Sequence, residues 1–119
     1  AFENWIHHEL RTYLSYKEHS DNLSYWRLSN GVEVDFIVGA MKVAIEAKAS
    51  KKISYHDLKG LRELKKEYPS LKKRIVVCME PQARFVMEPE TTEKRKKTDG
   101  IEILNYSLFV KKLWSNDLF

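Results

Sequence analysis

Two apolar runs follow each other in GVEVDFIVGAMKVAIEAKAS, residues 31–50, and charged side chains interrupt both runs. The alternation of apolar and polar residues predicts one strand over residues 32–39, with Val32, Val34 and Phe36 on one face, and a second over residues 41–49. Gly39 begins the tight reversal between them, so the two strands should pair as an antiparallel hairpin.

Three charged residues stand inside this hairpin. Asp35, Glu46 and Lys48 have apolar neighbours in the sequence, where a charge is costly unless something pairs with it. Side chains alternate along a strand, so Glu46 and Lys48 share a face, and the hairpin brings Asp35 close to Glu46. Two carboxylates held together repel each other unless a cation lies between them. The hairpin therefore predicts a Mg²⁺ or Mn²⁺ site beside which Lys48 orients water or stabilises phosphate charge.

The patterns on either side of the hairpin predict an α/β domain with a mixed sheet. Apolar residues at helical spacing predict a helix over residues 2–18, and NLSYWRLSNG reads as a short strand followed by a turn. Ser54 begins a second helix that ends at Pro69 and buries Leu58, Leu61 and Leu64. The apolar run KKRIVVCME predicts a strand parallel to the one before that helix. The core order is thus helix, three strands, helix, strand, followed by a short strand in IEIL and a closing helix in SLFVKKLW.

Residues 81–100 break this regular pattern. They contain Pro81, Pro89 and the run EKRKKTDG, with no clear apolar periodicity. We therefore predict a long surface loop over these residues.

The totals favour one folded domain over residues 1–119, in a cytoplasmic protein. No apolar run approaches the length of a membrane span, and the single Cys78 leaves no partner for a disulfide within the chain. The net charge is +4, yet residues 48–74 alone contain ten basic and three acidic residues, a net charge of +7. This stretch is either a solvated helix face or a surface that meets phosphates, and its candidate nucleic-acid contacts are Lys51, Lys52, Lys59 and Arg62.

The segments FENWIHHEL, YWRLSNGVEVDFIV, AIEAKAS, DLKGLRELKKEYP and DGIEIL extend over nearly the whole chain. With Asp35, Glu46 and Lys48 they resemble the PD-(D/E)XK nuclease superfamily, and more narrowly the domain of unknown function at the C-terminus of many prokaryotic AAA-type ATPases, which is similar to Holliday-junction resolvases. The resemblance implies a restriction-endonuclease-like core and hydrolysis of nucleic acid phosphodiesters. It also implies that the chain is the C-terminal fragment of a longer ATPase.

Carried over to this sequence, the resemblance makes Asp35 and Glu46 metal ligands and Lys48 the catalytic lysine, while Glu3 completes the metal site. Three departures stand next to these residues: Val34 occupies the place of the superfamily's proline, Ala47 the place of a common valine and Ala49 the place of a common serine. The chain contains no Walker A phosphate loop. The partners implied are DNA, the N-terminal ATPase module and, as in junction-cutting relatives, a second copy of the chain.

Two other interpretations of the same residues are kept. Lys48 can form a structural ion pair with Glu46 or Asp35, which would make the domain a noncatalytic module that docks on its ATPase or on DNA with a vestigial metal site. The tryptophans and Tyr25 can stack on bases, although their positions in periodic patterns favour core packing or an interface. The histidines lack the spacing and the cysteine partners of a zinc site.

Overall fold

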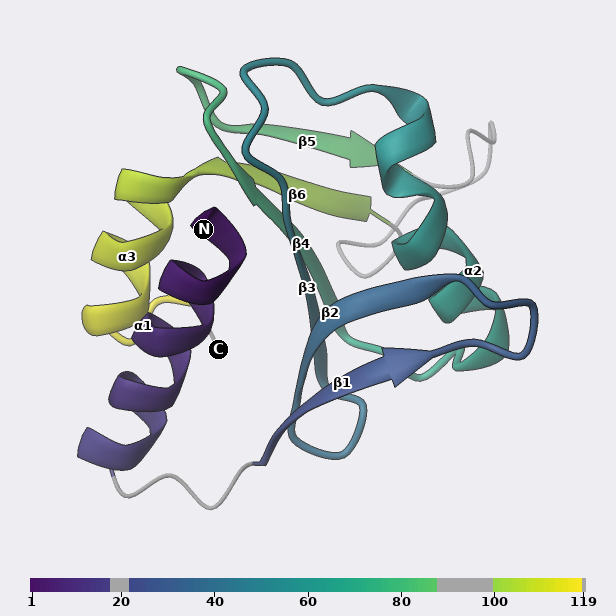
Figure 1. Cartoon of the computed structure of the whole chain (residues 1–119), viewed down its shortest axis with the longest axis horizontal. Coiled ribbons are helices and arrows are strands. Elements are labelled where there is room, and N and C mark those ends of the chain that lie inside the picture. Colours follow the sequence, from purple (N-terminus) through teal and green to yellow (C-terminus); the bar gives the residue numbers. More distant parts are fainter. Residues whose placement is uncertain (18–21, 88–99, 119) are drawn as a thin grey trace.

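The computed structural model describes residues 1–17, 22–87 and 100–118, and these residues form one sheet with helices on both faces (Figure 1). The elements run in the order α1 (Phe2–Tyr16), β1 (Leu23–Arg27), β2 (Glu33–Val38), β3 (Val43–Ala47), η1 (Tyr55–Leu58), α2 (Lys59–Glu67), β4 (Lys73–Cys78), β5 (Arg84–Met87), β6 (Gly100–Asn105) and α3 (Tyr106–Trp114). The predicted α/β class and the predicted order of helix, three strands, helix and strand are confirmed. None of the helices in these residues is long and apolar enough to cross a membrane.

The six strands form a mixed sheet in the order β1-β2-β3-β4-β6-β5. Strands β1, β2 and β3 pair antiparallel, as the hairpin pattern predicts. Strand β4 pairs parallel with β3 because η1 and α2 carry the chain back across the sheet between them. Strand β4 also pairs parallel with β6, so it lies in the middle of the sheet and its residues from 74 to 78 are buried.

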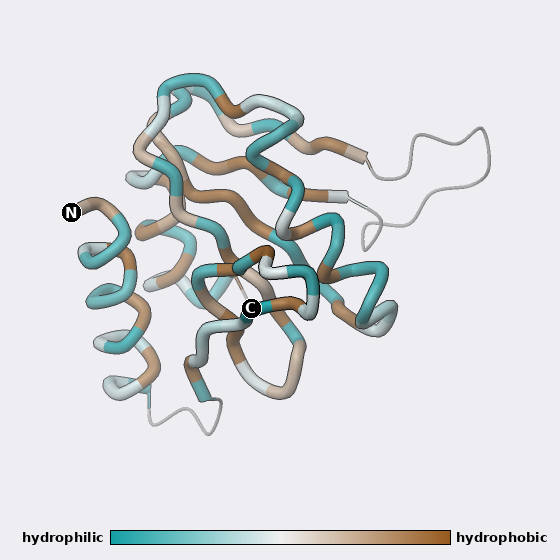
Figure 2. Tube along the Cα trace, turned by 45° about the vertical axis from the view of Figure 1, so that its right-hand side comes forward, coloured by the Kyte–Doolittle hydropathy of each residue, from teal (hydrophilic) through white to brown (hydrophobic). Residues whose placement is uncertain are grey.

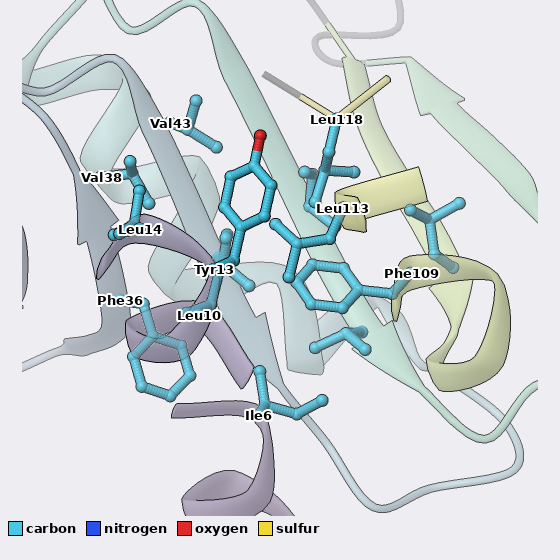
Figure 3. Packing of buried hydrophobic residues seen from close by; sticks show 14 residues of the cluster. Ile6, Leu10, Tyr13, Leu14, Phe36, Val38, Val43, Phe109, Leu113 and Leu118 are labelled. Atoms are coloured by element: carbon cyan, nitrogen blue, oxygen red, sulfur yellow. The ribbon is translucent and has the colours of Figure 1, made fainter. Parts of the chain in front are cut away.

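A separate hydrophobic core lies on each face of the sheet. On one face, Ile6 and Leu10 of α1 meet Phe109 and Leu113 of α3 over the strands (Figure 3). On the other face, α2 covers the sheet with its leucines. Figure 2 shows the same division, with hydrophobic strands inside and hydrophilic stretches of helix outside. Burial of a leucine- or isoleucine-sized side chain contributes about 1.5–3 kcal/mol, so the two cores hold the helices firmly on the sheet.

Strand β2 contains a β-bulge, which the alternating pattern did not predict. Ser24 pairs with Ile37 and Trp26 pairs with Val34, so the two residues Asp35 and Phe36 lie opposite one residue of β1. The prediction that Val32, Val34 and Phe36 share a face is therefore wrong: Val34 packs in the α2-side core and Phe36 in the α1-side core. A bulge bends the strand and redirects the side chains at that point.

The predicted loop over residues 81–100 is wrong for Arg84–Met87, which form β5 at the edge of the sheet, and for Gly100, which begins β6. Strand β5 pairs antiparallel with β6, and the ring of Phe85 lies over Gly100, where a Cβ atom would collide with it. The pattern missed this strand because four residues next to a proline carry too little periodicity. Residues 88–99 lie outside the described residues.

Helix α2 approaches β2 closely at Gly60. A Cβ atom at this position would lie 2.8 Å from the backbone oxygen of Glu33, which cannot move without displacing β2. We therefore expect Gly60→Ala to lower the free energy of unfolding by about 1–3 kcal/mol, although alanine is the better helix former. Urea denaturation measures this change. The exposed Lys66→Ala on the same helix is the control, and a Gly60→Ala variant as stable as that control would contradict the close approach.

Candidate functional site

Asp35 and Glu46 meet at the point where β2 and β3 separate. Regular pairing of the two strands extends from Val38 opposite Val43 to Phe36 opposite Ile45. Beyond that pair, Glu46 Oε1 accepts a hydrogen bond from the backbone N–H of Asp35 at 3.2 Å. Asp35 Oδ2 in turn accepts one from the backbone N–H of Ala47 at 2.9 Å. The structure thus brings together the two carboxylates that the sequence predicted to meet, and it adds reciprocal bonds to the backbone.

The carboxyl group of Glu46 is strongly perturbed. Burial is the main cause and the charge of Asp35 the second, and together they raise the pKa of Glu46 to about 8, while the charge of Lys48 acts in the opposite direction. Two adjacent carboxyl groups in a partly buried place cannot both carry a negative charge cheaply. Near neutral pH the pair therefore holds a proton, or it needs a cation.

Glu3 and Lys48 lie within electrostatic reach of this pair. Glu3 stands in the first turn of α1, and the charge of Asp35 is the largest cause that raises the pKa of Glu3, with Lys48 acting against it. Lys48 follows the last residue of β3, and its backbone N–H donates to the oxygen of Val77 at 2.9 Å. The charges of Asp35 and Lys48 thus act in opposite directions on the pKa of both Glu3 and Glu46. In the part of the chain that the structure describes, however, no group of three or more His, Cys, Asp and Glu side chains is gathered as a ready metal centre.

A cavity of about 350 Å³ opens beside Asp35, between α1, β1 and β2. Its floor includes Phe36, on which the imidazole of His7 is stacked with ring centroids 5.7 Å apart and planes 7° from parallel. Tyr25 and Glu3 line the same cavity. Tyr25 is 54% exposed, so it does not pack in the core, and its role at an interface stays a prediction. At this cavity Tyr25 is therefore open to solvent, whereas Phe36 is buried.

The segment after β3 is fixed from the neighbouring strands. Glu80 Oε2 accepts from the backbone N–H of Ile53 at 2.6 Å, and the guanidinium of Arg84 donates both to Glu80 and to the oxygen of Ile53. The backbone N–H of Met79 donates to the oxygen of Ser50 at 2.9 Å. Sequence reasoning missed Glu80 and Arg84, because an acidic and a basic residue four positions apart beside a proline look like solvated charges.

The basic stretch divides into two groups in space. Lys51, Lys52 and Lys59 are exposed on the segment that leads from β3 into α2, which runs over the top of the view in Figure 1. Arg62 is half-buried on α2. Other basic side chains of the stretch bond within the fold: Lys65 donates to the oxygens of Pro69 and Leu71, Lys73 to that of Leu118, and the buried Arg74 to that of Leu61. Three of the predicted phosphate-facing residues, Lys51, Lys52 and Lys59, are thus accessible, and Lys66 and Lys72 are exposed elsewhere in the stretch.

Comparison with known proteins gives a family and nothing finer. The family model described as a domain of unknown function (DUF4143) matches residues 1–107, which is most of the chain. No curated protein and no solved structure matches the chain.

The raised pKa of Glu46 makes the stability of the chain depend on pH. The folded state binds the proton of the Glu46 carboxyl group more tightly than the unfolded state does. The contribution of this proton to the free energy of unfolding is therefore complete below pH 4.5 and is lost as the pH rises toward 8. Glu46→Gln keeps an acceptor for Asp35 and removes the charge. A chelator is present to exclude bound metal. Between pH 4 and pH 9 we expect the free energy of unfolding of the variant to rise relative to that of the unmodified chain by on the order of 3 kcal/mol.

Urea denaturation across this pH range measures the difference. The exposed Glu67→Gln on α2 is the matched control and should run parallel to the unmodified chain. A Glu46→Gln profile that is also parallel would show that the Glu46 carboxyl group is not perturbed.

Proposed function

The chain belongs to the DUF4143 family of domains, and we propose that it is a metal-dependent, nuclease-like domain that acts on phosphodiesters of nucleic acid as the C-terminal module of a prokaryotic ATPase. The observation that supports this proposal most is the pair of reciprocally bonded carboxylates, Asp35 and Glu46, with Lys48 next to them. The PD-(D/E)XK resemblance uses these residues in the same roles.

The donor chemistry of the pair fits a divalent cation. Asp35 and Glu46 supply hard oxygen ligands. Burial first and the charge of Asp35 second raise the pKa of Glu46, and a bound cation would favour its charged form. Mg²⁺ typically takes one or two protein carboxylates and completes its shell with water and substrate phosphate, so a compact cage of protein ligands is not required. Asp35 and Glu46 would hold the ion, with Glu3 as a further acidic group on the α1 side. Bound there, Mg²⁺ or Mn²⁺ would polarise the phosphate and make water a better nucleophile.

The side chains of the chain itself have separate roles in this proposal. The Lys48 ammonium would donate hydrogen bonds to a non-bridging phosphate oxygen and offset the charge that grows there during hydrolysis. Because Asp35 and Glu46 would hold the same ion, they would fix the position of the reacting phosphate relative to Lys48. Lys51 and Lys52, on the segment after β3, would bind neighbouring phosphates and orient the strand. Hydrolysis adds water across one P–O bond, leaving one strand end with a phosphate and the other with a hydroxyl.

A second function is favoured by a specific observation. Each carboxylate accepts a hydrogen bond from a backbone N–H that the separated strands leave without a ladder partner. This is a structural use of Asp35 and Glu46 that requires no catalysis. The alternative is therefore a noncatalytic module that docks on the ATPase module, on a second copy of the chain or on DNA.

Calorimetric titration of Mn²⁺ separates the two functions. Asp35→Asn keeps an oxygen that accepts from the Ala47 N–H and removes the charge, so we expect the fold to persist while Mn²⁺ affinity falls at least tenfold. Cleavage of a labelled branched DNA should fall at least a hundredfold in the same variant. Glu67→Gln is the control for a lost surface charge. Equal Mn²⁺ binding by Asp35→Asn and the unmodified chain would remove the metal site from the proposal.

Lys48→Met tests the role of the ammonium group. This variant loses no carboxylate, so we expect Mn²⁺ binding to stay within about threefold while cleavage falls about a hundredfold or more, the size of effect seen when one charge-stabilising donor is removed. A parallel loss of Mn²⁺ binding and cleavage would mean that Lys48 acts by holding the carboxylates in place.

Removal of two phosphate-binding lysines should change the salt dependence of DNA binding. For Lys51→Ala/Lys52→Ala we expect the slope of log K against log salt to become shallower by about 1.8, because each lost phosphate contact removes about 0.9 on duplex DNA. The double variant Lys17→Ala/Lys111→Ala removes the same charge from exposed positions on α1's end and α3 and should keep the slope. Equal slopes for the two double variants would exclude this surface as the phosphate contact.

A further inference from the structure

Tyr55 presents an aromatic ring to solvent beside the basic segment. It is the first residue of η1 and is 60% exposed, although a tyrosine ring is largely apolar. The guanidinium carbon of Arg62 lies 3.8 Å from the centroid of this ring, so the two planar groups are in contact. Arg62 covers part of the ring, and the rest of the ring remains accessible.

The backbone around Tyr55 is held on both sides. Ser54 and Asp57 form a capping box, in which the N–H of Ser54 donates to Asp57 Oδ2 at 2.9 Å. This bonding is the main cause that lowers the pKa of Asp57. On the preceding side, Glu80 and Arg84 fix both backbone groups of Ile53. An exposed ring on a fixed backbone loses little conformational entropy when a ligand covers it, which makes Tyr55 a prepared contact.

Tyr55 lies near the candidate site as well as near the basic side chains. Tyr55 follows Lys48 by seven positions on one segment, and the backbone N–H of Met79 holds that segment by donating to the oxygen of Ser50 at 2.9 Å. Tyr55 therefore stands on the segment that leaves the end of β3, next to Lys48. The acidic groups nearby are paired or capped, since Asp57 bonds to Ser54 and Glu63 lies 3.6 Å from Lys66. A polyanion that crosses the site meets Lys51, Lys52 and Lys59 and the ring of Tyr55 on the same segment.

We propose that Tyr55, backed by Arg62, stacks on an unpaired base, so that the site takes single-stranded or branched nucleic acid in preference to continuous duplex. This inference rests on the proposed function and names the substrate class of the same site. A continuous duplex hides the faces of its bases, whereas an unpaired base offers a face to an aromatic ring. The lysines bind the backbone phosphates of either form, and only the ring distinguishes them.

The test is the fluorescence anisotropy of two labelled probes, an oligothymidine of about 12 nucleotides and a duplex of the same length, which lie within the site sizes of single-strand binders. A matched oligouridine distinguishes DNA from RNA as the source of the strand. Each titration is made with EDTA and with Ca²⁺. We expect Tyr55→Ala to weaken binding of the single strand by about fivefold to a hundredfold, the range for one stacked base, and to change duplex binding less than twofold. Tyr55→Phe keeps the ring and should bind as the unmodified chain does.

Tyr16→Ala is the matched control. Tyr16 is 73% exposed near the end of α1, and a cation, Lys17 Nζ, also lies over its ring at 5.8 Å. This control should leave both probes unchanged. The salt slope should also be the same for Tyr55→Ala as for the unmodified chain, because no phosphate contact is removed.

Three results would overturn the inference. Unchanged single-strand binding by Tyr55→Ala, or an equal loss for single strand and duplex, would show that the ring does not recognise unpaired bases, while the Mn²⁺ titration of Asp35→Asn would still stand for the carboxylate site. If the unmodified chain binds none of the probes under either condition, both the stacking role and the nucleic-acid part of the proposed function fail.

Discussion

The separation of β2 and β3 after a β-bulge is the constraint on which the rest of the structure depends. Where two strands part inside a sheet, their backbone N–H groups lose ladder partners, and a buried unsatisfied N–H costs about 1–3 kcal/mol. Asp35 and Glu46 supply the missing acceptors from their side chains. The bulge makes this geometry attainable, because it places Asp35 and Phe36 opposite one residue of β1. Phe36 then reaches the α1-side core, and Asp35 lines the cavity between α1, β1 and β2.

The use of two carboxyl groups as acceptors for these backbone N–H groups has an electrostatic cost. Two carboxyl groups now stand close together in a partly buried place, and the pKa of Glu46 rises to about 8 as a result. Replacing either one by alanine would leave a backbone N–H without an acceptor, so such a variant loses stability for a reason unrelated to catalysis. Asparagine and glutamine keep the acceptor and remove only the charge. A structural role and a metal-binding role are therefore separable in this chain, although the same atoms serve both.

Whether a feature of this fold could be predicted depends on how far apart its interacting residues lie along the sequence. The hairpin, the capped second helix and the parallel strand depend on local periodicity and turn residues, and the patterns predicted all three. The encounter of Asp35 with Glu46 followed from hairpin geometry alone. The bulge could not be predicted, because an alternating pattern of apolar and polar residues indicates an unbroken strand unless its pairing with the neighbouring strand is known. Strand β5 pairs with β6, whose partner residues lie 13 to 19 positions further along the chain. The Glu80 and Arg84 contacts reach Ile53, which is 27 and 31 positions away.

The net charge of a stretch is also a poor guide to its surface. Residues 48–74 carry a net charge of +7, yet Arg74 lies in the interior and Lys65 closes the end of α2 by bonding to Pro69 and Leu71. Lys66 and Lys72 are exposed elsewhere in the stretch, but Lys51, Lys52 and Lys59 are exposed together along the segment from β3 into α2, whose backbone is fixed by Glu80, Arg84 and the capping box. Because fixed groups lose less entropy on binding than flexible ones, this shorter segment is a better prepared binding surface than the whole basic stretch would be. The local order of the chain, more than its total charge, therefore decides where a polyanion would be bound.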